Sequence, residues 1–144
     1  MKALIDTNVI IDALQSRKDF NEDAEFAMLQ AYEYDGYIAA TSITDIYYIQ
    51  RRYYRDQEKA KDNLVKILSL YDVIDITRTD CRNAIRSSIS DYEDAVLVES
   101  AIRNDIDCIV TRNTKDFKNS GITICTSTEF LRLLKTKRKG ERSQ

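Results

Sequence analysis

A short strand passes directly into a helix in the segment KALIDTN, which covers residues 2–8. Lys2 to Ile5 is an apolar strand that ends at Asp6, and apolar residues at 9, 10, 13 and 14 then follow the spacing of one helical face. The same alternation continues along the chain. It predicts strands at 37–40, 73–76, 108–111 and 122–124, and helices at 24–32, 56–71 and 127–134, with a further short helix from Thr79. Asp35-Gly36 is expected to close the second helix, and Thr41-Ser42 and Ser90 are expected to cap the helices that follow them.

Strands that alternate with helices predict a single α/β sandwich with a mainly parallel sheet and right-handed crossovers. The near-continuous apolar run at 108–111 is typical of a strand that is buried on both faces of such a sheet. No repeat, linker or low-complexity segment interrupts the pattern before the basic end of the chain. We therefore predict one domain over residues 1–134 and a basic, disordered tail over residues 135–144.

The composition is that of an ordinary globular domain, with 144 residues, 43% apolar and 32% charged. No apolar stretch approaches the roughly 20 residues that a membrane-spanning helix needs. An aspartate at position 6 also interrupts any signal-peptide pattern, so we predict a cytoplasmic protein. The three cysteines, at positions 81, 108 and 125, lack the close spacing of a zinc site or a disulfide framework.

Acidic side chains recur where strands end and helices begin. Asp6 follows the first strand, Asp45 follows the second, and Asp116 follows the strand at 108–111. Asp91 and Asp94 lie three residues apart near the start of a helix. Ligands of parallel α/β sheets bind at the carboxyl ends of the strands, where these acids would meet. The chain contains no histidine, so hydrolytic chemistry must use carboxylates, and gathered carboxylates need cations. We predict a Mg²⁺ or Mn²⁺ site.

Each acid also has a purely structural interpretation. Asp6 is a suitable N-cap for the helix that follows it. Asp45, Asp91 and Asp94 lie in or near first helical turns, where the helix dipole favours negative charge. Asp116 is suited to capping a turn. A single cap does not explain the other clusters, and the set is therefore far more specific than any of its members.

Basic residues are gathered in two places although the formal net charge is −2. Arg51, Arg52 and Arg55 lie among several tyrosines, and the last ten residues contain five lysines or arginines. Local basic strips of this kind can bind a phosphate backbone. The alternative is a solvated helix face and a frayed terminus. The tyrosines, among them Tyr47 and Tyr54 on one helical face, suit either a core or a dimer surface.

Three motifs together resemble the PIN-domain nucleases, and among them the bacterial toxins of the VapC type. They are LIDTN at residues 4–8, DYEDA at 91–95 and VTRNTKDF at 110–117. The resemblance covers the chain from Lys2 to about Leu134. It implies a three-layer α/β/α fold, metal-dependent cleavage of RNA phosphodiester bonds with one or two Mg²⁺ or Mn²⁺ ions, and a homodimer. For a toxin it also implies an antitoxin partner, which lays a helix along a hydrophobic groove. The region from Tyr47 to Tyr54 is a candidate for that groove or for the dimer face.

The resemblance also assigns roles to residues. Asp6, Asp94 and Asp116 would bind the metal, with Asp91 as an additional acid and Asp45 where many relatives carry glutamate. The remaining assignments are positioning residues that orient the carboxylates, namely Thr7, Asn8, Ser42, Thr111 and Asn113, and RNA-contacting residues, namely Arg51, Arg52, Arg55 and Arg112.

Other functions remain open at this point. The protein could be an RNA-processing enzyme and not a toxin, or a PIN-like module that binds RNA or protein without cleaving. A phospho-acceptor receiver domain expects adjacent acids after the first strand, whereas Asp6 lies between Ile5 and Thr7. A haloacid-dehalogenase-like phosphatase needs a second aspartate at position 8, which is asparagine here.

Overall fold

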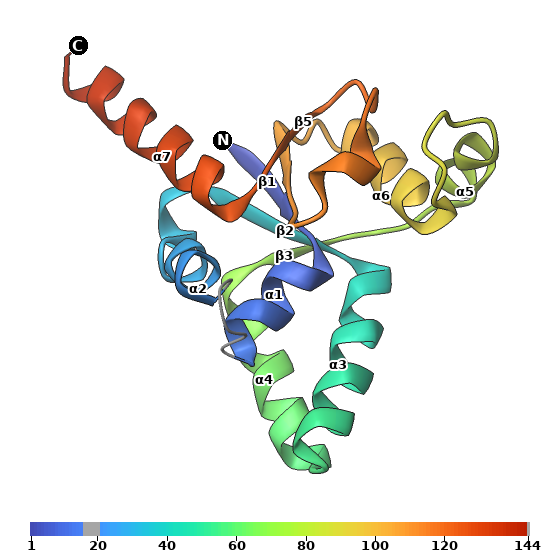
Figure 1. Cartoon of the computed structure of the whole chain (residues 1–144). Coiled ribbons are helices and arrows are strands. Elements are labelled where there is room, and N and C mark those ends of the chain that lie inside the picture. The colour runs from blue at the N-terminus through green and yellow to red at the C-terminus, as the bar shows by residue number, and fades with distance from the viewer. Residues whose placement is uncertain (16–20, 144) are drawn as a thin grey trace.

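A five-stranded parallel sheet forms the middle layer of the computed structural model, which describes residues 1–15 and 21–143 (Figure 1). Its strand order is β3-β2-β1-β4-β5, and every neighbouring pair is parallel. The predicted α/β sandwich is therefore confirmed. The strands are β1 (Lys2–Ile5), β2 (Asp35–Ala39), β3 (Asp72–Ile74), β4 (Cys108–Val110) and β5 (Thr123–Cys125).

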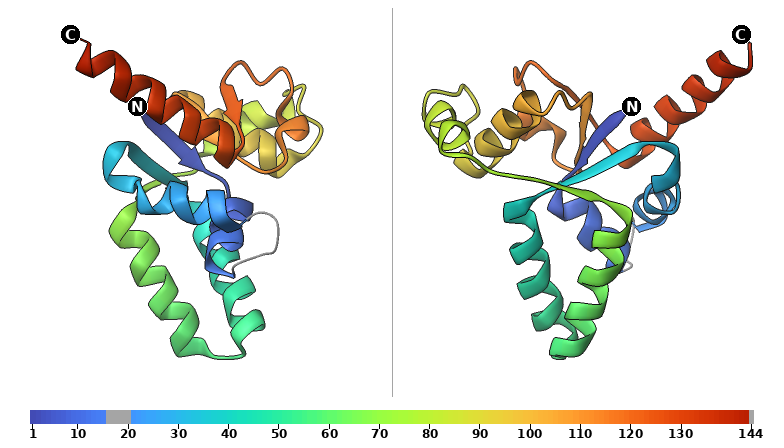
Figure 2. Two further views of the ribbon diagram at one scale, coloured as in Figure 1. Left: turned by 60° about the vertical axis from the view of Figure 1, so that its left-hand side comes forward. Right: turned by 180° about the vertical axis from the view of Figure 1, so that it is seen from behind.

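Helices cover both faces of the sheet. They are α1 (Thr7–Leu14), α2 (Asn21–Leu29), α3 (Ala40–Tyr54), α4 (Gln57–Leu70), α5 (Arg78–Ile85), α6 (Tyr92–Arg103) and α7 (Ser127–Arg142), with short 3₁₀ helices η1 (Ala31–Glu33) and η2 (Thr114–Phe117). Helices α3 and α4 form a hairpin that extends away from the sheet (Figure 2). In the described part of the chain, no helix has the length and apolar character needed to cross a membrane.

Alternate residues of β1 build the two cores, because successive side chains of a strand point to opposite faces. Ala3 and Ile5 pack into a core with side chains from α1, α2, α3, α4 and α7. Leu4 packs into the opposite core with side chains from α5 and α6. All three side chains are fully buried or nearly so. The result is the three-layer α/β/α arrangement that the sequence resemblance implied.

The centre of the sheet contains the topological switch point. β1 pairs with β2 on one side and with β4 on the other, although β4 comes much later in the chain. Crevices for ligands open at the carboxyl ends of strands at such a point. Asp6 follows β1 directly, and its backbone N–H donates to the carbonyl of Val110 over 2.9 Å. The end of β1 and the loop after β4 are thus held side by side.

Several predicted boundaries were wrong. Asp35 and Gly36 do not end the second helix but begin β2, where a Cβ on Gly36 would lie 2.4 Å from Cδ1 of Tyr71. α3 begins at Ala40 without a side-chain cap, and Asp91, not Ser90, caps α6.

The last helix also differs from the prediction. Residues 135–142, which we predicted to be a disordered tail, continue α7 as far as Arg142. Two causes are visible. Lysine and arginine are good helix formers. The guanidinium of Arg138 also donates to Oε1 of Gln30 over 3.0 Å and forms an ion pair with Glu33, which tethers the helix to the segment around η1.

Candidate active site

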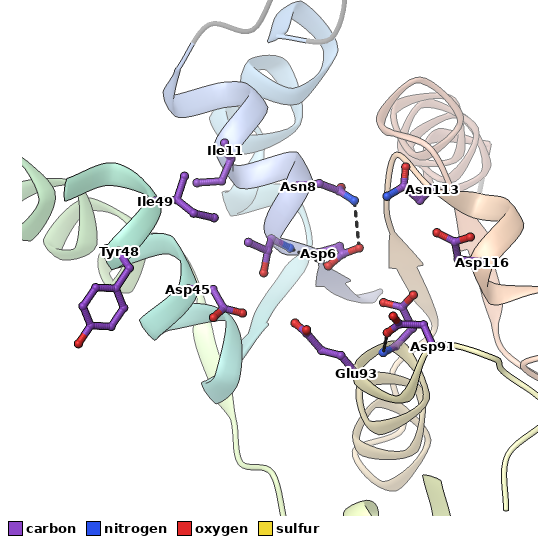
Figure 3. Close-up of a pocket in the computed structure, with 12 residues that line it drawn as sticks. Asp6, Asn8, Ile11, Asp45, Tyr48, Ile49, Asp91, Glu93, Asn113 and Asp116 are labelled. Carbon is purple, nitrogen blue, oxygen red and sulfur yellow. Dashed lines mark hydrogen bonds between the residues drawn. The ribbon is translucent and has the colours of Figure 1, made fainter. Parts of the chain in front are cut away.

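An open cavity of about 520 Å³ lies at the switch point. We call it the acid pocket, because half of its lining residues carry a carboxylate (Figure 3). The acidic lining residues are Asp6, Asp45, Asp91, Glu93, Asp94 and Asp116, and the others are Thr7, Asn8, Ile11, Tyr48, Ile49 and Asn113. Among the residues that the structure describes, no lysine or arginine lines this pocket.

Asp6 is held in place by several donors. Its Oδ1 accepts from the backbone N–H of Thr7 over 2.8 Å, so the same side chain caps α1. Its Oδ2 accepts from Oγ1 of Thr111 over 2.8 Å and from Nδ2 of Asn8 over 3.3 Å. Burial raises the pKa of the Asp6 carboxyl, although the hydrogen bonds from Thr111 and Thr7 oppose the rise. Asp6 therefore has two roles, since it caps α1 and lines the acid pocket.

Side chains on α1 connect it to the loop after β4. Oδ1 of Asn8 accepts from the backbone N–H of Arg112 over 3.1 Å. Oγ1 of Thr111 accepts from the backbone N–H of Asn113 over 3.1 Å. The guanidinium of Arg112 donates to Oδ1 of the buried Asp12 over 3.2 Å. These contacts fix the wall of the pocket around Asp6.

The first turn of α6 supplies three of the acids. Asp91 is the N-cap, and its Oδ1 accepts from the backbone N–H of Asp94 over 2.9 Å. Burial raises the pKa of Asp94 to about 7, and the negative charges of Asp91, Asp6, Asp116 and Glu93 add to the rise. A carboxyl with this pKa lies in a field of uncompensated negative charge.

Glu93 extends into the middle of the acid pocket, between Asp45 on α3 and Asp6 (Figure 3). Burial raises the pKa of Glu93, and the nearby Asp45 and Asp91 carboxylates raise it further. Asp45 and Glu93 therefore form a second acidic side of the pocket, opposite Asp116.

The donor set of the acid pocket fits a hard divalent cation. It contains carboxylate and amide oxygens and neither cysteine nor histidine, which is the ligand set that Mg²⁺ and Mn²⁺ prefer. In residues 1–15 and 21–143, however, no three such side chains lie close enough together to hold an ion as they stand. Asp45, Asp91, Glu93 and Asp116 are all exposed. Binding of an ion would therefore require side-chain rotations that bring at least three ligands to one point.

The structure brings all five predicted acids to the acid pocket, together with Thr7, Asn8 and Asn113. Thr111 lies behind Asp6. Ser42 is buried at the start of α3 and does not line the pocket. Of the predicted RNA-contacting residues, Arg51, Arg52 and Arg55 are exposed along α3, whereas Arg112 is paired with Asp12.

Sequence reasoning missed four lining residues, namely Glu93, Tyr48 and the apolar Ile11 and Ile49. Glu93 had a usable signal, because it lies in the first helical turn between two acids that were singled out. Tyr48 had one as well, since it is three residues after Asp45 and hence on the same side of α3.

A parallel α/β sandwich with a carboxylate pocket at its switch point defines the class of the protein, and comparison with known proteins gives the family. Residues 2–115 match the family model of the PIN domain, so the chain belongs to the PIN domain family. This is a family of nucleases. The resemblance noted in the sequence is thereby confirmed.

Solved structures share the fold. A chain of VapBC2 from Rickettsia felis, bound to a DNA fragment from their promoter, is 20% identical over 87% of this chain and 97% of that chain, with a TM-score of 0.65. A chain of a toxin-antitoxin complex from Klebsiella pneumoniae is 23% identical over 87% of this chain and 97% of that chain, with a TM-score of 0.66. A chain of DNA-bound VapBC from Salmonella typhimurium is 16% identical over 88% of this chain and 98% of that chain, with a TM-score of 0.67. A comparison with curated protein sequences found no match.

Proposed function

We propose that the protein is a metal-dependent endoribonuclease and the toxin of a toxin-antitoxin pair. The observation that carries the nuclease proposal is the acid pocket, where six carboxylates without a lysine or arginine among them meet at the switch point of a PIN fold. Such a pocket repels a polyanion unless cations neutralise it. The proposed reaction is the hydrolysis of RNA phosphodiester bonds.

Asp6, Asp94 and Asp116, assisted by Asp91, are the residues that we propose to hold Mg²⁺ or Mn²⁺. A bound ion of this kind lowers the pKa of water and shields the charge of the phosphate. Asp6 is pre-oriented by its donors Thr7, Asn8 and Thr111, so little ordering is left for it on binding.

Asp45 and Glu93 lie across the acid pocket and offer carboxylate oxygens that can accept a proton from the attacking water. The chain contains no histidine, so we assign the role of general base to a carboxylate.

The toxin proposal is supported by the structural likeness to chains of VapBC and of a toxin-antitoxin complex. It is also supported by an apolar hollow of about 650 Å³ between α1, α2 and α4. Leu29 and Tyr32 line this hollow and are 76% and 88% exposed, which is unfavourable in water without a partner. We propose that a cognate antitoxin covers it. The predicted groove at Tyr47 and Tyr54 is a poorer candidate, because the Tyr54 hydroxyl donates to the carbonyl of Leu14 on α1.

The test of the nuclease proposal is cleavage of a mixed RNA pool by purified protein with Mn²⁺, with Mg²⁺ or with EDTA. We expect metal-dependent cuts that disappear in Asp6→Asn and persist in Asp62→Asn, an exposed acid on α4 outside the acid pocket. Cleavage that is equal in wild type and Asp6→Asn would show that another protein or another site cuts. If neither cleavage nor metal binding occurs, a non-cleaving binding module replaces the proposal.

The toxin proposal has a separate test. Induced expression of the wild-type chain should arrest bacterial growth, and expression of Asp6→Asn should not. If the wild type cleaves RNA in vitro but leaves growth unchanged at equal protein level, an RNA-processing enzyme is the better description.

A further inference from the structure

One face of helix α3 runs from the acid pocket outward to the exposed surface of the protein. Asp45, Tyr48 and Ile49 line the pocket from this helix. Arg52 lies four residues beyond Tyr48 and three beyond Ile49, so it continues the same face one turn further from the acids. The Tyr48 ring is 61% exposed and points away from the carboxylates at the rim of the pocket (Figure 3).

The Tyr48 ring is supported from one side. Its centroid lies 5.1 Å from that of Tyr47 at an interplanar angle of 74°, an edge-to-face contact. A ring that is held in place at low entropic cost and is open to solvent is a suitable platform for another flat group.

The Arg52 side chain is exposed on α3. Among the described residues, no carboxylate forms an ion pair with Arg51, Arg52 or Arg55. Helical geometry separates the three, since each residue turns the chain by about 100°. Arg52 therefore lies on the same face of α3 as the residues that line the pocket, whereas Arg51 lies on another face of the helix. Arg55 follows the helix as its C-cap in the left-handed conformation, at φ 52°.

We propose that the face of α3 from Tyr48 to Arg52 is a binding track for single-stranded RNA that leaves the acid pocket. A base next to the cleaved phosphate stacks on the Tyr48 ring, and a phosphate further along the strand binds the Arg52 guanidinium. The two residues are about 6 Å apart along the helix, which matches one to two nucleotides. This inference rests on the proposed nuclease function and adds the form of its substrate, an unpaired segment whose bases are free to stack.

The chemistry of the face favours RNA over a protein partner. An aromatic ring followed by an unpaired guanidinium is the combination that binds bases and phosphates of single strands. A second copy of the chain would have to bring a carboxylate to Arg52 without placing its other acids against the acid pocket. Self-association through α3 is therefore the alternative that the experiment must exclude.

Binding is measured in the Asp6→Asn background, so that the RNA stays intact, by fluorescence anisotropy of a labelled 12-nucleotide unstructured RNA. We expect Tyr48→Ala to weaken binding about 5- to 100-fold and Tyr48→Phe to restore it, because stacking needs the ring and not the hydroxyl. Phe26→Ala is the matched control, since the Phe26 ring is also exposed but lies on α2 and does not line the acid pocket. It should leave affinity unchanged.

Arg52→Gln should lower the slope of log affinity against log salt by about 0.7, the value for one phosphate contact with a single strand. Arg86→Gln, an exposed arginine at the end of α5, should leave the slope unchanged. Equal losses for Tyr48→Ala and Phe26→Ala, or an unchanged slope in Arg52→Gln, would overturn the track. So would a Tyr48→Ala variant that binds RNA normally but changes oligomeric state in sedimentation.

The readout separates this inference from the proposed function. RNA binding that depends on Tyr48 in a protein whose wild type never cleaves would support the track and refute the nuclease. Metal-dependent cleavage with no effect of Tyr48→Ala on KM or affinity would do the reverse.

Discussion

Removal of one charge from the acid pocket should stabilise the metal-free protein. Asp94 is the best position for this test, because the pKa of its carboxyl is raised to about 7 by burial and by the charges of Asp91, Asp6, Asp116 and Glu93. Asparagine has nearly the same shape and cannot ionise. Asp94→Asn should therefore relieve the repulsion with little change in packing.

The sign and size of the effect follow from linkage. An acid whose pKa is raised in the folded state binds its proton more tightly there than in the unfolded chain, so stability falls as pH rises from about 4 to 7 and stays low above. The rise from 3.8 to about 7 sets a ceiling of about 4 kcal/mol, at about 1.4 kcal/mol per pKa unit. Asp94 is partly exposed, so solvent screening reduces this severalfold. The substitution also removes a favourable negative charge from the first turn of α6, and this loss lowers the net gain in stability by about 0.5 kcal/mol.

We therefore expect Asp94→Asn to stabilise the protein by about 1 kcal/mol at pH 8, which raises Tm by about 3 °C. The gain should vanish at pH 4.5. Thermal unfolding by circular dichroism in EDTA, at both pH values, measures it. Asp62→Asn on α4 is the control and should shift stability by less than about 0.5 kcal/mol. A difference in Tm that is the same at both pH values, or negative at pH 8, would refute the repulsive cluster.

Three further results are expected. Mn²⁺ at 100 times its Kd should stabilise the wild type by about 2.7 kcal/mol and so raise its Tm, and it should raise the Tm of Asp6→Asn much less. Equal gains in the two proteins would place the ion elsewhere. Gly36→Ala should destabilise by about 1–3 kcal/mol in urea unfolding, because its Cβ would meet the buried Tyr71 ring, and a neutral result would mean that the ring yields. Asp12→Asn and Arg112→Gln should each destabilise by about 1–3 kcal/mol, and the double variant by clearly less than the sum.

The fold could be predicted because its pattern is local. The runs at residues 2–5 and 108–111 are largely apolar, as is typical of strands in a parallel sheet covered on both faces, and the helices between the strands show a 3.6-residue period. The acids could be placed for the same reason. Once Asp6 and Asp116 follow neighbouring parallel strands, topology alone puts them at one edge.

The errors occurred where tertiary contacts override local preference. Gly36 looked like a helix end, but the close approach of Tyr71 is what requires a glycine there. Residues 135–142 looked like a charged tail, but contacts from Arg138 to Glu33 and Gln30 support a helix. Ser42 looked like a cap beside the site, yet it is buried in the core. None of these contacts leaves a periodic signal in the sequence.

The acids of the pocket are not equally constrained, and this asymmetry bears on how it would work. Asp6 has hydrogen-bond donors on both carboxylate oxygens, whereas Asp45, Glu93 and Asp116 are exposed and lie among like charges. A fixed carboxylate beside several adjustable ones can define where a cation binds and still let the remaining ligands adapt to it. In the described part of the chain, no three such ligands surround one point as they stand. Cation binding should therefore order the exposed acids while leaving Asp6 in place.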